Sequence, residues 1–200
     1  MKQFNCSILM IATIVLFSAC HGTPEHMLFK DDPIIDVFNI KPENGKAALV
    51  VARTFSQNVL LYGSLALNFD NYVDKKMIGT SNSKSYFVKT DIAPGMHYVI
   101  AKGPENVEPV KLNFEPQKIY YIMEFARPGK WRPRVSALLV KPDELRTSLD
   151  SDCRLMVYDT KNPGNDLSDK DYEDAVRDYE REVKEGVHKE HAEYRGVPAK

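Results

Sequence analysis

The sequence predicts a mainly β protein, an antiparallel β-sandwich of about seven strands followed by a C-terminal α-helical arm. Between residues 45 and 142, apolar runs of five to nine residues, rich in Val, Ile, Tyr and Phe, recur about every ten residues with Pro, Gly, Asn and Asp between them. No long helical period separates these runs, so a parallel sheet with helical crossovers is not expected. Beyond residue 142 the composition becomes acidic, and one segment has a helical apolar period.

Residues 1–19 are predicted to be a lipoprotein signal peptide. Lys2 precedes an apolar run from Ile8 to Phe17, which is about half the length that a bilayer-spanning helix needs. Two small residues and Cys20 follow this run, and the letters LFSAC resemble the lipobox of bacterial lipoproteins. That resemblance implies that Cys20 is acylated, with chains such as palmitate, and begins the mature chain. An ordinary signal peptide that ends near a cysteine is the alternative.

Residues 20–44 are predicted to be a tether, because residues 21–44 hold three prolines and show little periodicity. The cysteines support this division of the chain. Cys6 leaves with the signal peptide and Cys20 carries lipid, so that Cys153 has no partner for an intrachain disulfide. We expect Cys153 to be buried and inert, with a redox or intermolecular site as the alternative.

The β-sandwich domain is predicted to span residues 45–149. Its strands are expected near residues 47–55, 60–69, 85–90, 96–102, 109–114, 118–126 and 134–140. In the strand expected at 96–102, one face holds His97, Val99 and Ala101, and the residues between them face the opposite way. The Pro94-Gly95 pair before that strand suits the central positions of a type II turn.

Residues 150–200 are predicted to be an acidic helical extension. They hold 14 acidic and 9 basic residues, whereas residues 21–149 hold 14 acidic and 17 basic residues, so the two parts have complementary charge. Ser168 is the predicted N-cap of the helix and Gly186 its end. Either the domain itself or a partner protein covers the apolar stripe of this helix. The stripe consists of Tyr172, Val176, Tyr179 and Val183.

The sequence contains no common catalytic motif, such as Gly-x-Ser-x-Gly, a phosphate-binding glycine loop, His-Glu-x-x-His or Cys-x-x-Cys. We therefore expect no catalytic residue, no metal site and no cofactor. The alternative is a hydrolase or a metal-dependent enzyme that uses His97, or the pair His188 and His191 with Glu190 or Glu193 as an oxygen ligand. For His97 we expect a half-buried ring bonded to a backbone carbonyl. The formal net charge of −1 argues against a nucleic-acid partner.

A basic loop is predicted at residues 127–134, which read RPGKWRPR. Its four cations surround Trp131, the only tryptophan of the chain. Such a loop suits anionic lipid headgroups, a phosphate or sugar polymer, or an acidic partner. The alternative is that Trp131 folds inward and caps the domain. The four cations are Arg127, Lys130, Arg132 and Arg134.

The predicted strands and turns read GKAALVVAR, NYVDKKMIG, SYFVKTDIAPGMHYVIAKG, VKLNFEPQKIYYIMEF and PRVSALLVKPDE, and the range from the first to the last of them is about half of the chain. These segments resemble a bacterial β-sandwich family that is found largely in lipoproteins and is known only as a domain of unknown function. The family's Pro-Gly-x-His turn is present at residues 94–97 and its Tyr-Tyr pair at 120–121, whereas Lys75 and Gln117 stand where the family has glycine. The resemblance implies the sandwich architecture and brings no established activity.

These features predict a lipid-anchored protein of the bacterial cell envelope. His21, rather than an aspartate, follows the acylated cysteine, which by resemblance to lipoprotein sorting indicates the outer membrane. The expected function is that of a non-catalytic interaction or accessory module. Its partners are the membrane, through the lipid anchor, and an unidentified envelope protein or a second copy of the chain. The alternative is direct binding of an envelope glycan or lipid through the Trp131 loop.

Overall fold

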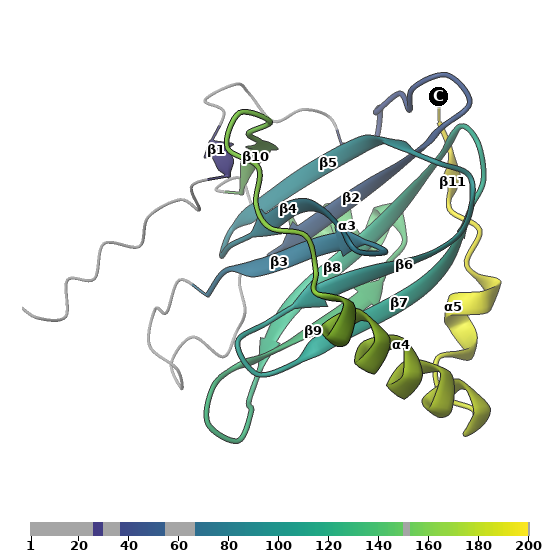
Figure 1. Ribbon diagram of the computed structural model, residues 1–200. Coiled ribbons are helices and arrows are strands. Elements are labelled where there is room, and N and C mark those ends of the chain that lie inside the picture. The colour runs from purple at the N-terminus through teal and green to yellow at the C-terminus, as the bar shows by residue number, and fades with distance from the viewer. Residues whose placement is uncertain (1–25, 30–36, 55–66, 150–152, 200) are drawn as a thin grey trace, which may run out of the picture.

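The computed structural model describes residues 26–29, 37–54, 67–149 and 153–199 (Figure 1). The predicted signal peptide, Cys20 and most of the strand expected at 60–69 lie outside these residues. The fold is mainly β, with two sheets and a C-terminal helix, as predicted. None of the described helices is long and apolar enough to span a bilayer.

The larger sheet, sheet A, has seven strands in the order β1-β10-β5-β2-β8-β11, with β9 also paired to β8. The pairs β2–β8 and β10–β5 are parallel, so the prediction of a purely antiparallel architecture is wrong for this sheet. Between the strands of each parallel pair, the described chain passes through the strands of the second sheet. The strands are β1 Met27–Phe29, β2 Ala47–Arg53, β5 Ser85–Ile92, β8 Lys118–Arg127, β9 Arg134–Leu139, β10 Arg154–Tyr158 and β11 Val197–Pro198.

The smaller sheet, sheet B, has four antiparallel strands in the order β4-β3-β6-β7. With sheet A this gives eleven strands among the described residues, where about seven were predicted. β1, β4, β10 and β11 have no counterpart in the prediction and have six residues or fewer each, and β3 shares only Phe69 with the strand expected at 60–69. The strands of sheet B are β3 Phe69–Val73, β4 Lys76–Ser81, β6 Gly95–Lys102 and β7 Val107–Phe114.

The main hydrophobic core takes side chains from both sheets. Leu49 and Phe87 of sheet A belong to the same buried cluster as Val99 and Leu112 of sheet B. The opposite face of sheet A is also buried, because α3 (Pro142–Ser148) and the segment around Val37 and Ile40 cover it. Cys153 is buried on this side, as expected.

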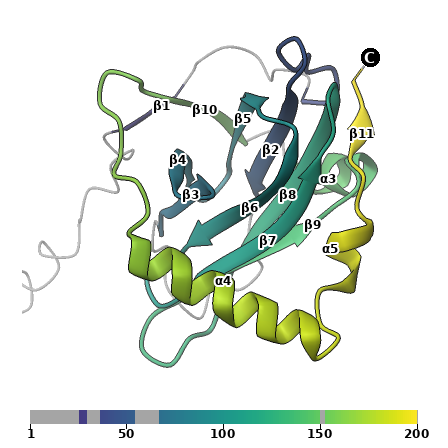
Figure 2. The same cartoon turned by 45° about the vertical axis from the view of Figure 1, so that its right-hand side comes forward.

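The C-terminal segment contains α4 (Asp169–Lys184) and α5 (Lys189–Glu193). The predicted cap is confirmed, since the Ser168 Oγ accepts a hydrogen bond of 3.1 Å from the Asp171 N–H. The helix ends just before Gly186, whose φ of +88° is favourable for glycine. Figures 1 and 2 show α4 crossing the β6 and β7 side of sheet B, after which the chain returns through α5 to β11.

The turns of sheet B explain the role of His97. Asp74 lies in the turn between β3 and β4 and has a φ of +55°. Its Oδ2 atom is 2.8 Å from His97 Nδ1. The same carboxylate accepts a hydrogen bond of 3.1 Å from the Tyr98 N–H. The expected backbone-carbonyl partner for His97 is therefore wrong, and the ring instead fixes this turn through a carboxylate. Gln117, where a glycine was expected, also has a positive φ of 58°.

Candidate functional site

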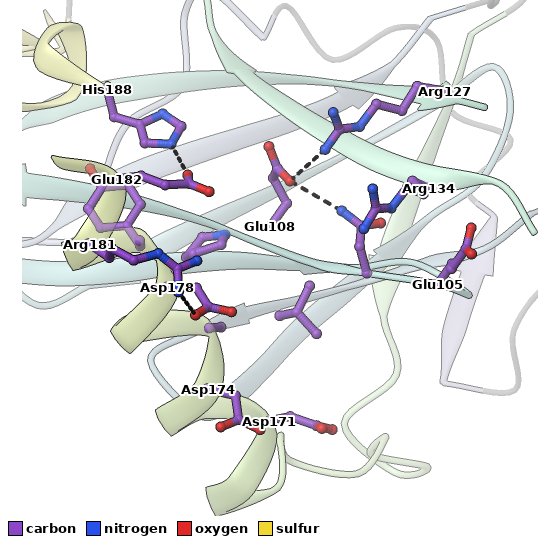
Figure 3. A pocket seen from close by; sticks show the side chains of 15 residues that line it. Glu105, Glu108, Arg127, Arg134, Asp171, Asp174, Asp178, Arg181, Glu182 and His188 are labelled. Carbon is purple, nitrogen blue, oxygen red and sulfur yellow. Dashed lines mark hydrogen bonds and ion pairs between the residues drawn. The ribbon is translucent and has the colours of Figure 1, made fainter. Parts of the chain in front are cut away.

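A polar groove of about 570 Å³ lies between α4, the start of β7 and the strand ends that carry the 127–134 loop (Figure 3). Six carboxylates, three arginines and His188 line it. Four of the carboxylates belong to α4, so the charged face of this helix forms one wall of the groove. The groove runs from the basic loop at one end to the α4–α5 turn at the other.

Glu108 of β7 lies at the centre of the groove. The Arg127 guanidinium is 3.3 Å from its Oε2 atom, and the Asn106 side-chain amide donates to the same oxygen at 3.2 Å. Burial raises the pKa of Glu108, while the charge of Arg127 opposes that rise. Arg127 and Arg134 are opposite each other in the β8–β9 ladder, and Figure 3 shows both turned toward Glu108. Two of the four cations predicted to surround Trp131 therefore belong to the groove.

The Trp131 loop has a fixed backbone and an outward-pointing tryptophan. The Glu105 carboxylate accepts hydrogen bonds from three successive backbone N–H groups, those of Lys130, Trp131 and Arg132, at 3.1, 3.2 and 3.4 Å. Gly129 permits this arrangement, because a Cβ there would overlap the Glu105 carboxylate. Trp131 is 84% exposed, so its ring points away from the core. Glu105 gives no signal in the sequence, where it is a single acid in a turn.

At the other end of the groove, two histidines and a glutamate come together. His188, Glu190 and His191 each offer one ligand atom, and these atoms lie within 4.8 Å of one another. Burial, followed by the neighbouring His188, lowers the pKa of His191 to about 4. His191 is therefore a neutral imidazole at physiological pH. The sequence predicts no metal site, and the fold brings together the two histidines of the alternative prediction with Glu190 rather than Glu193.

The stripe of α4 packs against sheet B of its own chain. The Tyr98 ring of β6 meets the edges of Tyr172 and Tyr179, with centroid distances of 6.2 and 5.8 Å. Tyr179 is 4% exposed, whereas Val183 at the end of the stripe is 39% exposed. Val176 is half-buried. Within the described residues, sheet B thus covers most of the apolar stripe of α4.

Ion pairs reinforce this contact and realise the predicted charge complementarity. Lysines of sheet B meet carboxylates of the arm along the whole length of the contact. Because these pairs are partly exposed, each contributes little stability, and together they fix the register of the arm. The pairs are Lys75–Asp169 at 2.7 Å, Lys76–Asp166 at 3.2 Å, Lys102–Asp171 at 2.7 Å and Lys111–Glu180 at 2.5 Å.

A buried carboxyl group lies between the sheets, away from the groove. Glu124 of β8 is fully buried and accepts a hydrogen bond from the Ser81 hydroxyl. Burial raises its pKa to about 7, against the effects of Ser81 and of the nearby Arg53. Burial in turn lowers the pKa of Arg53 to about 10. The sequence gives no sign of this pair, since Glu124 stands within an otherwise apolar strand.

A second polar hollow of about 650 Å³ lies beside β3 and the segment 161–166. In it the His26 Nε2 atom is 2.5 Å from the Thr80 hydroxyl, which donates to Asp70 at 2.7 Å. Thr80 is completely buried, and its proton is directed to a carboxylate rather than to the imidazole. This arrangement does not activate the hydroxyl as a nucleophile.

No family model, no curated protein and no solved structure matches this chain. The resemblance to the uncharacterised β-sandwich family therefore stays a prediction.

Proposed function

We propose that this protein is a non-catalytic, lipid-anchored module of a bacterial cell envelope that docks on an anionic membrane surface through its Trp131 loop. The two sheets, which share a core, would then act as a sandwich scaffold that holds the loop rigidly. The observation that carries the proposal is the 84% exposure of the only tryptophan on a backbone fixed by Glu105. Tryptophan is enriched at interfaces and in the interface belts of membranes, where one end of the side chain is in an apolar environment and the other is in water.

The chemistry of the loop tip suits a lipid interface. Tryptophan concentrates at the headgroup level of bilayers, where its ring is half in an apolar and half in a polar environment. Lys130 and Arg132 flank it and are exposed, and each basic residue near an anionic surface contributes about 1 kcal/mol of binding. Because three backbone N–H groups already bind Glu105, docking costs little ordering of the loop.

The membrane is expected to be near the loop because of the predicted anchor at Cys20. Replacing Cys20→Ala should release the protein from the membrane or leave its precursor uncleaved, since no described helix can span a bilayer. Detergent-phase partitioning and intact mass measure both results. If the Ala variant is cleaved and held at the membrane like the wild type, the lipoprotein interpretation fails.

Docking of the loop can be read directly from Trp131 fluorescence in the full-length protein reconstituted into vesicles. With vesicles that contain anionic phospholipid we expect a blue-shifted emission that is protected from iodide, and high salt should reverse both. The double variant Lys130→Ala/Arg132→Ala should lose about 2 kcal/mol of docking free energy, roughly a thirtyfold shift toward the undocked state.

The matched control is Lys161→Ala/Lys170→Ala, which removes the same charge from exposed positions of the arm. It should leave the emission unchanged. Equal emission with anionic and zwitterionic vesicles, or an unaltered blue shift in the loop variant, would show that the loop does not dock.

A further inference from the structure

The turn from α4 into α5 gathers metal-binding groups. His188 has a left-handed backbone with a φ of 61°, which turns its ring toward both α4 and α5. Its ring centroid is 4.8 Å from that of His191 and 5.0 Å from that of Tyr179. Glu190 lies between the two histidines in the sequence, and its carboxylate is 3.7 Å from the Nε2 atom of His191. Two imidazoles and one carboxylate thus face one another.

Neighbouring groups hold each imidazole by its other nitrogen. His188 Nε2 is 2.8 Å from a Glu182 oxygen, and because an ionised carboxylate only accepts hydrogen bonds, Nε2 of the neutral ring carries the proton. The lone pair of His188 is therefore on Nδ1. His191 Nδ1 is 3.0 Å from the Tyr179 hydroxyl, which leaves Nε2 toward Glu190. Such partners on the second nitrogen orient histidine ligands around metal ions in proteins.

We propose that His188, Glu190 and His191 bind a divalent transition metal of the zinc class. Imidazole nitrogen with carboxylate oxygen is a ligand set that zinc accepts, with water in the fourth position. Tetrahedral zinc places its ligand atoms about 3.4 Å apart, so the three donors, which lie within 4.8 Å of one another, close up by at most about 1.4 Å. Glu190 can make this movement, because its side chain is 70% exposed. Zn²⁺ binds the lone pair of the neutral His191 ring at Nε2, while the ring proton lies on Nδ1, where the Tyr179 hydroxyl oxygen accepts it.

Bound metal would hold the α4–α5 turn against α5, next to the groove that His188 also lines. The full-length protein in detergent, stripped with chelator and dialysed, should bind one Zn²⁺ in isothermal titration calorimetry and unfold at a higher temperature with Zn²⁺. Mg²⁺, which prefers a set of oxygen ligands, should do neither. This expectation does not depend on docking of the Trp131 loop.

Two variants separate this site from zinc binding elsewhere on the chain. In His188→Asn, the new asparagine accepts the positive φ of this position. In Glu190→Gln, the replaced side chain is exposed. Each should weaken Zn²⁺ binding at least tenfold and abolish the rise in unfolding temperature. Lys189→Ala, which lies between the ligands, should bind Zn²⁺ like the wild type. Wild-type affinity in both ligand variants, or no Zn²⁺ binding by the wild type, overturns the proposal.

Discussion

Replacing Tyr179→Ala is expected to destabilise the protein by about 3 to 5 kcal/mol, the range found when a large buried aromatic side chain is truncated. Tyr179 is 4% exposed, packs edge-on against Tyr98 and stacks on His188 and His191. Truncation therefore opens a cavity under α4 and removes the platform for both histidines. Chemical denaturation of the full-length protein, monitored by circular dichroism, measures the change in unfolding free energy.

Val183→Ala is the matched control for this change. Val183 belongs to the same stripe of the same helix but is 39% exposed, and alanine favours helix, so the change should stay within about 0.5 kcal/mol. An equally small effect of Tyr179→Ala would mean that the arm does not rest on sheet B in solution. The stripe would then be available to a second copy or an envelope partner, which is the alternative that the sequence left open.

The elements that the sequence predicts well are those with a local cause. The C-terminal helix is defined by Ser168, Gly186 and its apolar stripe, all of which act within a few turns of the chain. The longer strands alternate or are continuously apolar, as in β6 and β2. The chain bends at Pro94 between β5 and β6, and Gly95 has the positive φ, 124°, that a glycine at this position accepts. In each case neighbouring residues suffice to specify the conformation.

The missed strands depend on contacts between distant segments. β4 reads KMIGTS, which has neither a clean alternation nor a β-branched run, and a Cβ added at its Gly79 would make a tight contact of 3.1 Å with the Phe87 ring of sheet A. β1 and β11 have three and two residues and exist only as edge partners of β10 and β8. The parallel pairing of β2 with β8 likewise has no local signature.

The candidate site is harder to predict from sequence, because its parts come from separate elements. The letters RPGKWRPR identify a basic loop with one tryptophan, but nothing in them divides the cations between the tip and the groove. That division follows from Glu108 on β7, which binds Arg127, and from Glu105, which binds the loop backbone. The pair of histidines is visible in the sequence, whereas Glu182 and Tyr179 become their neighbours only through the turn after α4.

The buried Glu124 should make the protein less stable as pH rises from about 4.5 to about 7. Its ordinary pKa is 4.5 and its folded pKa is about 7, so in this interval the folded state retains a proton that the unfolded chain has lost. The effect is complete above the folded pKa. A difference of this size corresponds to on the order of 3 kcal/mol.

Glu124→Gln tests this prediction, because the amide stays neutral at every pH and its oxygen can still accept the Ser81 hydrogen bond. The variant also removes a negative charge near Arg53. The stability of the variant at pH 5, where wild-type Glu124 is protonated, therefore serves as the reference. From pH 5 to pH 8 the variant should gain about 2 to 3 kcal/mol relative to the wild type. Other titrating groups, including Glu108, cancel in this comparison. Parallel stability curves for the two proteins would mean that Glu124 titrates near its ordinary pKa, with water reaching it between the sheets.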